Sequence, residues 1–376
     1  MTSDERREGR YQRRRQHREN QRQKRIAACG TLDEIFSFEH LYKSYKLCCS
    51  GVGWKSSVQA YKANALVNVY KARAAVLDGT YKSRGFAEFD IFERGKPRHI
   101  RSVHISERVI QRCLCDYALV PLLSARFIYD NGASLKGKGI DFSLDRLNHN
   151  FREAAKMKKP CYVLSFDFSK YFDNARHEAI FAEYDKALPP WAMAWAKYFV
   201  GQFGDHGLGL GSQVSQISAL ALPNSLDHMI KEQLGIRLYA RYMDDGYLIH
   251  PDRKYLKHCL QEIKAKCGEL GIRLNPKKTQ ISRLDGMTFL KTRFFMSGTG
   301  RVIRLLNHQS VTRMRRKLRT FRRWADEGRI TRDEAANSYQ SWRGHAMRCN
   351  SRKAMRKLDS YFSELFKTEE RECSKW

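Results

Sequence analysis

Three aspartates stand where short apolar or alternating segments end. Asp167 follows an apolar run of strand length at residues 160–166, and the pair Asp244 and Asp245 interrupts an alternating segment that starts at residue 236. Carboxylates are preferred ligands of hard divalent ions such as Mg²⁺, which bridge an attacking hydroxyl, an α-phosphate and a leaving pyrophosphate in nucleotidyl transfer. If the two segments are neighbouring strands, the acids meet at one sheet edge. The pattern therefore predicts a nucleotidyl-transfer site.

The simpler interpretation is that these acids are solvated turn residues, because Asp-Asp pairs are common. Two features argue against it. The residues on both sides of Asp244 and Asp245 are typical of the two strands of a hairpin, which places the acids at its tip. Three like charges in one place are also costly unless a cation occupies it. Metal binding explains the position of all three acids.

The composition indicates a large basic protein with a polyanionic partner. The chain has 376 residues and 44.0 kDa, enough for one large core and two or three subdomains. It carries 70 Lys and Arg against 40 Asp and Glu, a formal charge of +30. Solubility alone does not require this excess, so we expect a long polyanion as the partner.

The same composition argues against secretion and membrane insertion. No run of about 18 apolar residues exists, and the Arg-rich N-terminus lacks the apolar segment of a secretory signal. The ten cysteines are scattered, and their close pairs lack the C-x2-C spacing of zinc modules. We expect a cytoplasmic protein with reduced thiols and no membrane contact.

Changes in composition divide the chain into parts. Residues 1–30 form a basic arm with nine Arg and one Lys against four acids, which we expect to become helical on binding. Helical spacing follows from residue 31, and basic strands are expected at 86–104. Residues 129–139 form a loop whose amides and ammonium groups suit phosphates. Helical, basic sequence returns after about residue 305.

Four segments resemble motifs of reverse transcriptases. Residues 242–245, Tyr-Met-Asp-Asp, are similar to the catalytic signature of that family, and residues 166–174 to its first carboxylate motif. Residues 274–279 resemble the motif whose lysine faces the triphosphate, and residues 286–291 the turn that grips the primer. The likeness spans roughly residues 100–300 and marks the chain as similar to bacterial reverse transcriptases of group II introns, retrons and diversity-generating retroelements.

A fifth segment indicates a subgroup. Residues 210–216, Leu-Gly-Ser-Gln-Val-Ser-Gln, resemble the segment that reads Gln-Gly-x-x-x-Ser-Pro in group II intron and retron enzymes. Leu210 and Gln216 depart from that form toward the one of diversity-generating-retroelement enzymes and some defence-associated relatives. The resemblance links loss of the usual glutamine, here Leu210, to altered fidelity, so error-prone copying is a further hypothesis.

The resemblance implies an α+β, right-hand polymerase fold with fingers, a palm of antiparallel sheet plus helices, and a helical thumb. After the arm at 1–30, it places N-terminal helices and fingers at 31–160. The palm with the carboxylates follows at 161–300, with 180–205 as a candidate fingers insert. The basic helical thumb occupies 301–376.

The resemblance also assigns roles to the acids. Asp167 and Asp244 are expected to ligate two Mg²⁺ ions, for which Mn²⁺ can substitute. Asp245 assists, and the backbone carbonyl of Phe168 is a further expected ligand. The ions lower the pKa of the primer 3′-hydroxyl and neutralise charge in the transition state.

One aromatic and several cations are expected to contact the incoming nucleotide. Phe172 stands where the family places an aromatic that excludes a 2′-hydroxyl, and a core aromatic is the alternative. Lys278, or its neighbour Lys277, is expected to give a proton or a charge to the departing pyrophosphate. For the rest of the set, the alternatives are a solvated surface or, at 207–211, a flexible loop. These residues are Leu210, Gly211, Arg108 and Lys136, with Arg112 and Lys138 beside them.

A second set is expected to contact template and primer. It consists of residues next to the catalytic motifs and of arginines in the predicted thumb. At helical spacing Leu318, Phe321 and Trp324 face the core and leave the arginine side for phosphates, with a solvated face as the alternative. The set comprises Ser215, Gln216, Tyr242, Met243, Arg315, Arg316, Arg319, Arg322 and Arg323.

The resemblance thus implies an RNA-directed DNA polymerase. Its expected partners are an RNA template, for which a structured non-coding RNA is a candidate, a DNA primer or product, deoxynucleotides and an accessory protein subunit. The biological role stays open between a diversity-generating retroelement and antiphage defence. The alternative from another class is a catalytically idle RNA-binding or maturase-like protein. The intact acids argue against it, because a pure binder gains nothing from three acids facing phosphates.

Overall fold

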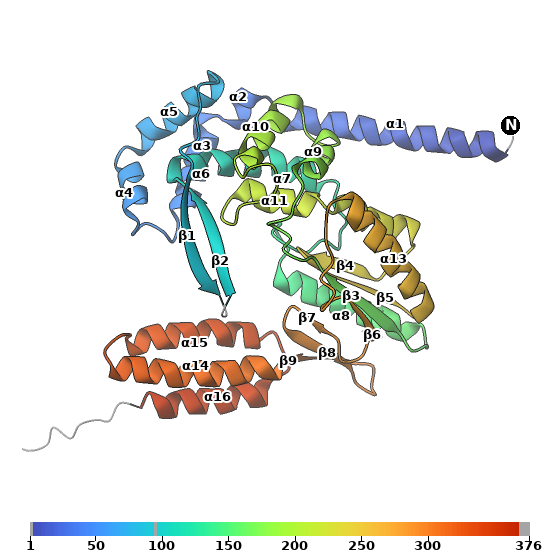
Figure 1. Cartoon of the computed structure of the whole chain (residues 1–376), viewed down its shortest axis with the longest axis vertical. Coiled ribbons are helices and arrows are strands. Elements are labelled where there is room, and N and C mark those ends of the chain that lie inside the picture. Colours follow the sequence, from blue (N-terminus) through green and yellow to red (C-terminus); the bar gives the residue numbers. More distant parts are fainter. Residues whose placement is uncertain (1–2, 94–95, 368–376) are drawn as a thin grey trace, which may run out of the picture. The chain divides into compact units, whose positions relative to one another are not determined.

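The computed structural model describes residues 3–93 and 96–367, which form two compact units (Figure 1). The first unit comprises the chain up to Gly139, Ser165–Gly246 and His258–Thr279. The second comprises Ile140–Leu164, Tyr247–Lys257 and the chain from Gln280 onward. The end of the predicted thumb, 368–376, and the middle of the predicted basic strands, 94–95, lie outside the described residues.

The N-terminal arm is one long helix, α1 (Ser3–Cys29). Side chains four residues apart support it, as in the hydrogen bond that Gln12 donates to Glu8. Near the C-terminal end of α1, the guanidinium of Arg22 donates to the backbone oxygen of Asp185 at 3.3 Å. The arm is thus helical in the structure, and whether binding induces the helix, as the sequence predicts, stays a prediction.

Short helices follow the arm, and hydroxyl side chains cap the first two. Thr31 and Glu34 form a reciprocal capping box at α2, and Ser37 caps α3. The helices of this part are α2 (Leu32–Ile35), α3 (Phe38–Cys49), α4 (Ser56–Ala63), α5 (Ala65–Leu77), α6 (Ile105–Leu114), η1 (Cys115–Leu119) and α7 (Val120–Ser124).

An antiparallel ribbon separates α5 from α6. Its strands are β1 (Phe86–Glu93) and β2 (Lys96–Val103), with Phe86 opposite Val103. Strands are therefore present where basic strands were expected at 86–104, but only β2 is basic. β1 contains three acids and no Lys or Arg, and its Glu88 pairs with Arg101 of β2.

A four-stranded sheet carries the aspartates. Its order is β4-β5-β3-β6, so β3 lies beside β5 as the sequence argument requires. The hairpin expected from residue 236 is present, but its first strand begins only at Tyr239. The reason is that the backbone nitrogen of Ile236 donates to Ile230 and closes the preceding helix. The strands are β3 (Tyr162–Asp167), β4 (Tyr239–Tyr242), β5 (Asp245–His250) and β6 (Gln280–Arg283).

Helices connect these strands. They are α9 (His177–Asp185), α10 (Pro190–Gly201), α11 (Gln213–Ala221), α12 (Asn224–His228), η2 (Met229–Gln233) and α13 (Arg253–Glu269). The candidate fingers insert at 180–205 contains the end of α9 and all of α10, and its role stays a prediction.

The second unit combines a small sheet with helices. α8 (Ile140–Lys156) precedes the antiparallel strands β7 (Thr288–Phe289), β8 (Thr292–Met296) and β9 (Val302–Leu306). Three C-terminal helices follow side by side (Figure 1): α14 (His308–Asp326), α15 (Arg332–Ala346) and α16 (Arg352–Leu365).

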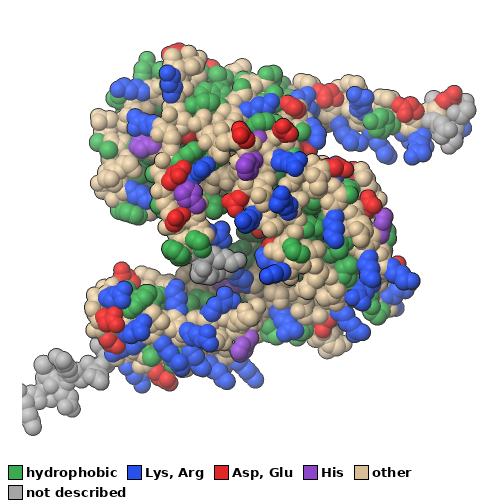
Figure 2. Space-filling view, in the orientation of Figure 1, with side chains coloured by type: hydrophobic (Ala, Val, Ile, Leu, Met, Phe, Trp, Pro, Cys, Tyr) green, Lys and Arg blue, Asp and Glu red, His purple; other side chains and the backbone are tan. Residues whose placement is uncertain are grey.

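An apolar core joins the three C-terminal helices. Met314 and Leu318 of α14 are buried against Tyr339 of α15 and Leu358 of α16, with Phe321 packed beside them. Lys and Arg side chains crowd the visible surface of these helices (Figure 2). The expected division into an apolar side and an arginine side is therefore present.

Two further findings concern the described residues as a whole. Every cysteine among them is a free thiol. No described helix is both long enough and apolar enough to cross a membrane.

Candidate active site

Asp167, Asp244 and Asp245 come together in the first unit. Asp167 ends β3, Asp245 begins β5, and Asp244 lies in the two-residue turn between β4 and β5. The backbone nitrogen of Phe168 donates to the backbone oxygen of Asp244 at 3.1 Å and ties the end of β3 to the turn. Met243, the other turn residue, has a φ of 54°, the left-handed conformation that tight hairpin turns use. The three acids therefore share one sheet edge.

Burial and neighbouring carboxylates raise the pKa values of Asp244 and Asp245. Burial, a hydrogen bond with Asp167 and the charge of Asp244 raise the pKa of Asp245 to about 7. Burial and the charge of Asp167 also raise the pKa of Asp244. Because like charges at short range do not all ionise without compensation, this site takes up a proton or a cation near neutral pH.

Lys278 supplies part of the compensating charge. Its ammonium donates to one oxygen of Asp167 at 2.5 Å, and the side-chain amide of Asn275 donates to the other at 3.2 Å. Partial burial lowers the pKa of Lys278, but the ion pair with Asp167 outweighs it and the pKa is raised. The lysine expected to face a triphosphate thus contacts a carboxylate, with its side chain 59% exposed. Sequence reasoning missed Asn275, although it lies in the same motif.

The donor chemistry of the site fits a hard divalent cation. Its candidate side-chain ligands are all carboxylates, and two of them have raised pKa values that a bound cation would lower. In the part of the chain that the structure describes, no three His, Cys, Asp or Glu side chains are arranged as a group that could hold a metal ion. One Asp167 oxygen is occupied by the Lys278 ammonium.

A buried ion pair supports the catalytic turn. The side chains of Arg241 and Asp227 are both 0% exposed and pair at 2.6 Å. Arg241 also donates to the backbone oxygen of Met243 at 2.8 Å, and the hydroxyl of Tyr239 donates to Asp227 at 2.5 Å. Burial lowers the pKa of Arg241, but Asp227 outweighs it and raises the pKa. Arg241 is therefore a charged brace behind the turn, which the sequence analysis missed.

Gly246 permits the close approach of β5 to β3. A Cβ atom at this position would lie 2.3 Å from the ring of Phe166, a separation that real Cβ atoms essentially never show. The ring is almost fully buried. A side chain at 246 would push against Phe166 of β3, the strand that carries Asp167.

The segment 207–211 is closely packed. A Cβ on Gly209 would lie 1.9 Å from the ring of Phe203. Gly211 has a φ of 111°, and a Cβ there would lie 3.5 Å from the backbone oxygen of Arg101 in β2. Packing against Phe203 and β2 thus leaves no room for larger side chains at Gly209, and the role of this segment in nucleotide binding stays a prediction.

The residues expected near nucleotide and primer differ in exposure. Phe172 and Leu210 are half-buried, so Phe172 is not a fully buried core aromatic. Ser215 is buried in the first turn of α11, where its backbone nitrogen donates to the hydroxyl of Ser212. Gln216 is exposed. A contact with template or primer thus stays a prediction that favours Gln216 over Ser215.

The loop at 129–139 uses its polar groups within the protein. Lys138 donates to the backbone oxygens of Tyr129 and Asn131 at 2.7 and 2.9 Å. The amide of Gly132 donates to the backbone oxygen of Arg241 at 2.9 Å. This loop pairs with β4, so these groups are not available to hold phosphates as expected.

Arg108, Arg112 and Lys136, three cations expected near the nucleotide, differ in their contacts within the protein. Arg112 forms an ion pair with Asp116, and Arg108 donates to the hydroxyl of Ser102 at 3.2 Å. Lys136 is exposed. Lys136 is therefore the least constrained of the three.

The candidate template-primer arginines of the second unit lie on α14. Arg319 donates to the hydroxyl of Tyr361 at 2.8 Å, and Arg322 pairs with Asp326 at 2.9 Å. Arg315 stacks over the Tyr361 ring, and Arg316 is exposed, as is the Arg323 side chain, whose nearest acid, Glu327, lies 3.8 Å away. In the first unit, Tyr242 and Met243 are half-buried at the hairpin.

The reverse transcriptase (RNA-dependent DNA polymerase) family matches residues 93–313, a span that holds β2, the sheet, all three acids and Lys278. Because the match covers more than half of the chain, the chain belongs to the reverse transcriptase family. No curated protein matches it. Family membership, together with the helices and antiparallel sheets, confirms the predicted α+β, right-hand polymerase fold. The bacterial subgroup stays a prediction.

Solved telomerase structures are similar to parts of the chain. Apo telomerase from Candida tropicalis is 11% identical over 80% of this chain and 64% of its own, with a TM-score of 0.47. Telomerase from Candida albicans in complex with a TWJ fragment of telomeric RNA is 13% identical over 76% and 56%, with a TM-score of 0.46. A C-terminally truncated apo telomerase from C. tropicalis is 12% identical over 64% of this chain and 60% of its own, with a TM-score of 0.45. The chain spans about three fifths of the length of these structures.

Proposed function

We propose that the protein is an RNA-directed DNA polymerase that extends a DNA primer on an RNA template. The observation that carries the proposal is the meeting of Asp167, Asp244 and Asp245 at one sheet edge, with two of their pKa values raised. Perturbed carboxylates that share one site are typical of functional centres. In a reverse transcriptase, nucleotidyl transfer is the chemistry that such a centre serves.

The acids and Lys278 have different roles in the proposed reaction. Asp167, Asp244 and Asp245, with the backbone carbonyl of Phe168, would hold two Mg²⁺ or Mn²⁺ ions. When bound, these ions lower the pKa of the primer 3′-hydroxyl and neutralise developing charge. Lys278 neutralises Asp167 in the free protein, and its exposed ammonium is suited to contact the triphosphate of an incoming deoxynucleotide.

The partners follow from charge and motif. The charge of +30 and the arginines of α14 support an RNA template and a DNA primer as ligands. The half-buried Phe172 supports selection of deoxynucleotides. We further propose a structured non-coding RNA as template, in a bacterial diversity-generating retroelement or an antiphage defence system, because Leu210 and Gln216 depart from the group II intron form. An accessory protein subunit completes this proposal.

Primer extension on an RNA template tests the activity. Asp244→Asn keeps the shape of the side chain but removes its charge, and we expect extension to fall about 10³-fold, which corresponds to about 4 kcal/mol of lost transition-state stabilisation. Asp205→Asn is the matched control, since Asp205 is exposed and lies outside the site. It should extend the primer like the wild type.

The outcomes separate the two classes of function. If the wild type binds RNA but extends no primer, the catalytically idle RNA-binding or maturase-like function replaces the polymerase. If Asp244→Asn extends the primer like the control, Asp244 takes no part in the reaction and the proposed carboxylate site is wrong. Sequencing the RNA and DNA that co-purify with wild type and Asp244→Asn then identifies the template. Template-matched DNA is expected only with the wild type.

A further inference from the structure

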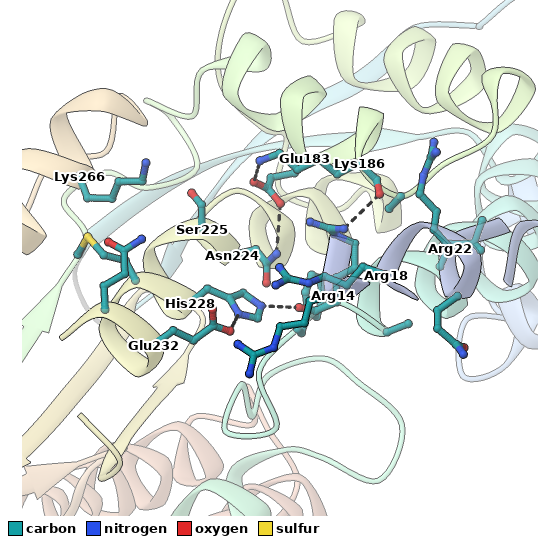
Figure 3. Close-up of a pocket in the computed structure, with 18 of the residues that line it drawn as sticks. Arg14, Arg18, Arg22, Glu183, Lys186, Asn224, Ser225, His228, Glu232 and Lys266 are labelled. Carbon is teal, nitrogen blue, oxygen red and sulfur yellow. Dashed lines mark hydrogen bonds and ion pairs between the residues drawn. The ribbon is translucent and has the colours of Figure 1, made fainter. Parts of the chain in front are cut away.

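A large cavity of the first unit lies beside α1, separate from the carboxylate site. Its volume is about 1190 Å³, and it is lined by α1, α9, α12, η2, α13 and the residues around the end of α7 (Figure 3). We call it the arm cavity. Among the described residues that line it, none belongs to the carboxylate site.

One wall of the arm cavity is a row of arginines. Arg14, Arg18, Arg22 and Arg25 stand three or four residues apart and so share one face of α1. Figure 3 shows the first three along the helix. Arg14, Arg18 and Arg25 form no hydrogen bond or ion pair with any residue that the structure describes. Their charge is available to a ligand.

The facing wall carries four glutamates, each of which has a basic side chain beside it. These pairs are Lys186–Glu183, Lys266–Glu269, His228–Glu232 and His258–Glu262, at 2.6, 2.7, 2.7 and 3.9 Å. Five arginines and two lysines line the cavity against these four glutamates, so the glutamates compensate only part of the positive charge. Within the described residues, the unpaired charge of the arm cavity is positive.

Arg126 shows the effect of this charge. It lines the cavity and donates to the backbone oxygen of Lys186 at 3.2 Å, but its Nε is buried without a partner in the described structure. The Nε of Arg22 is buried and unpartnered in the same way. Burial and the charges of the arm arginines lower the pKa of Arg126. Buried donors without acceptors, amid crowded cations, indicate a missing anion.

We infer that the arm cavity binds the sugar-phosphate backbone of a single-stranded nucleic acid. Arg10 lines the adjoining surface and lengthens the row at its N-terminal end. From Arg10 to Arg25 the row is about 22 Å long, at a rise of about 1.5 Å per residue. This length suits several phosphates, as in single-strand sites of about 4–16 nucleotides. The volume also exceeds the about 300–1,000 Å³ of small-molecule pockets.

The ligand class follows from the donors. Guanidinium groups bind phosphate oxygens in a bidentate fashion, and a regular row of them matches a repeating anion. Ser225, half-buried on the facing wall, offers a hydroxyl for a hydrogen bond to a sugar. The inference rests on the proposed function only for the class of ligand, because it does not require catalysis.

Two charge-matched variants test the inference. Arg14→Gln with Arg18→Gln removes two charges from the arm cavity, and Arg15→Gln with Lys24→Gln removes two from α1 at positions that do not line it. Glutamine is a good helix former, so α1 should persist, as circular dichroism can verify. The probes are a labelled single-stranded RNA of about 12 nucleotides and DNA of the same sequence, titrated by fluorescence anisotropy in EDTA without deoxynucleotides.

The expected result is specific to the cavity pair. Each lost phosphate contact lowers the slope of log K against log salt by about 0.7 for single strands, so Arg14→Gln with Arg18→Gln should lower it by about 1.4 and weaken binding about tenfold. Arg15→Gln with Lys24→Gln should change the salt slope and the affinity by less than half as much. Equal losses on RNA and DNA identify the backbone as ligand, and loss on RNA alone adds a 2′-hydroxyl contact.

Unchanged affinity in the cavity pair, or equal losses in both pairs, overturns the inference, and an acidic protein surface then replaces nucleic acid as the occupant. The result is independent of polymerase activity. If wild type extends no primer but the cavity pair still loses binding selectively, the proposed function fails and the arm cavity stands. If the wild type extends the primer and the two double variants bind nucleic acid equally well, the proposed function stands and the inference about the arm cavity fails.

Discussion

The carboxylate site and the arm cavity carry uncompensated charge of opposite sign and hold it differently. The acids lie on neighbouring strands, braced by an ion pair that is fully buried. The arm arginines lie on one exposed face of a single helix. Buried charge is expensive and persists only in a rigid frame, whereas exposed charge costs little. The comparison suggests a precise site for chemistry and an adaptable one for a polymer of varied sequence.

The strongest test of this contrast removes the brace. Arg241→Met leaves the carboxylate of Asp227 buried and unpaired, so we expect the free energy of unfolding to fall by about 3–5 kcal/mol in urea denaturation. Arg14→Gln with Arg18→Gln should change it by less than about 0.5 kcal/mol.

A double variant identifies the cause. Arg241→Met with Asp227→Leu replaces the ion pair by apolar side chains and should recover much of the lost stability. A double variant that is less stable than Arg241→Met alone would show that Asp227 stabilises the fold through another partner, the hydroxyl of Tyr239, and that charge compensation is not the main effect.

The next test uses the proton affinity of the acids. The pKa of Asp245 rises from 3.8 to about 7 in the folded protein, so the folded state binds more protons than the unfolded chain between these values. Stability should therefore fall as pH rises from about 4 to 7 in EDTA. Urea midpoints should fall less in Asp245→Asn, which cannot titrate there, and added Mg²⁺ should reduce the fall in wild type. Parallel curves for both proteins would refute the assignment.

The last test concerns Lys278, where the expected effect on stability is small. Its ion pair with Asp167 is half exposed, so Lys278→Gln should change the free energy of unfolding by less than about 1 kcal/mol. The same substitution should clearly slow primer extension and raise the KM for deoxynucleotides. Lys277→Gln, at the exposed neighbouring position, is the control. A KM in Lys278→Gln equal to that of the wild type would remove Lys278 from nucleotide binding, and a raised KM in Lys277→Gln alone would assign the role to Lys277.

Much of the active-site frame could be predicted from the sequence. Acids that interrupt apolar or alternating segments have few stable positions other than strand ends, so Asp167 and the hairpin with Asp244 and Asp245 were predictable. The apolar positions of α14 likewise predicted the core around Leu318. Local periodicity was sufficient in these cases.

Long-range pairing explains what could not be predicted. An arginine in an alternating strand suggests an exposed position, and only tertiary contact with Asp227 makes Arg241 a buried brace. The composition of the loop at 129–139 predicts phosphate binding, but in the fold Gly132 donates to the backbone oxygen of Arg241 and Lys138 to that of Asn131. Trp324 was expected in the core, yet it is half-buried beneath Arg329.

The hydrogen atom that serves as the side chain of Gly246 limits how this site can vary. The Phe166 ring occupies the space that a larger side chain would need, so a methyl group at 246 must displace the ring or shift the backbone next to Asp245. Gly246→Ala would therefore disturb the placement of an acid without altering its charge, and so separate the effect of geometry from that of charge.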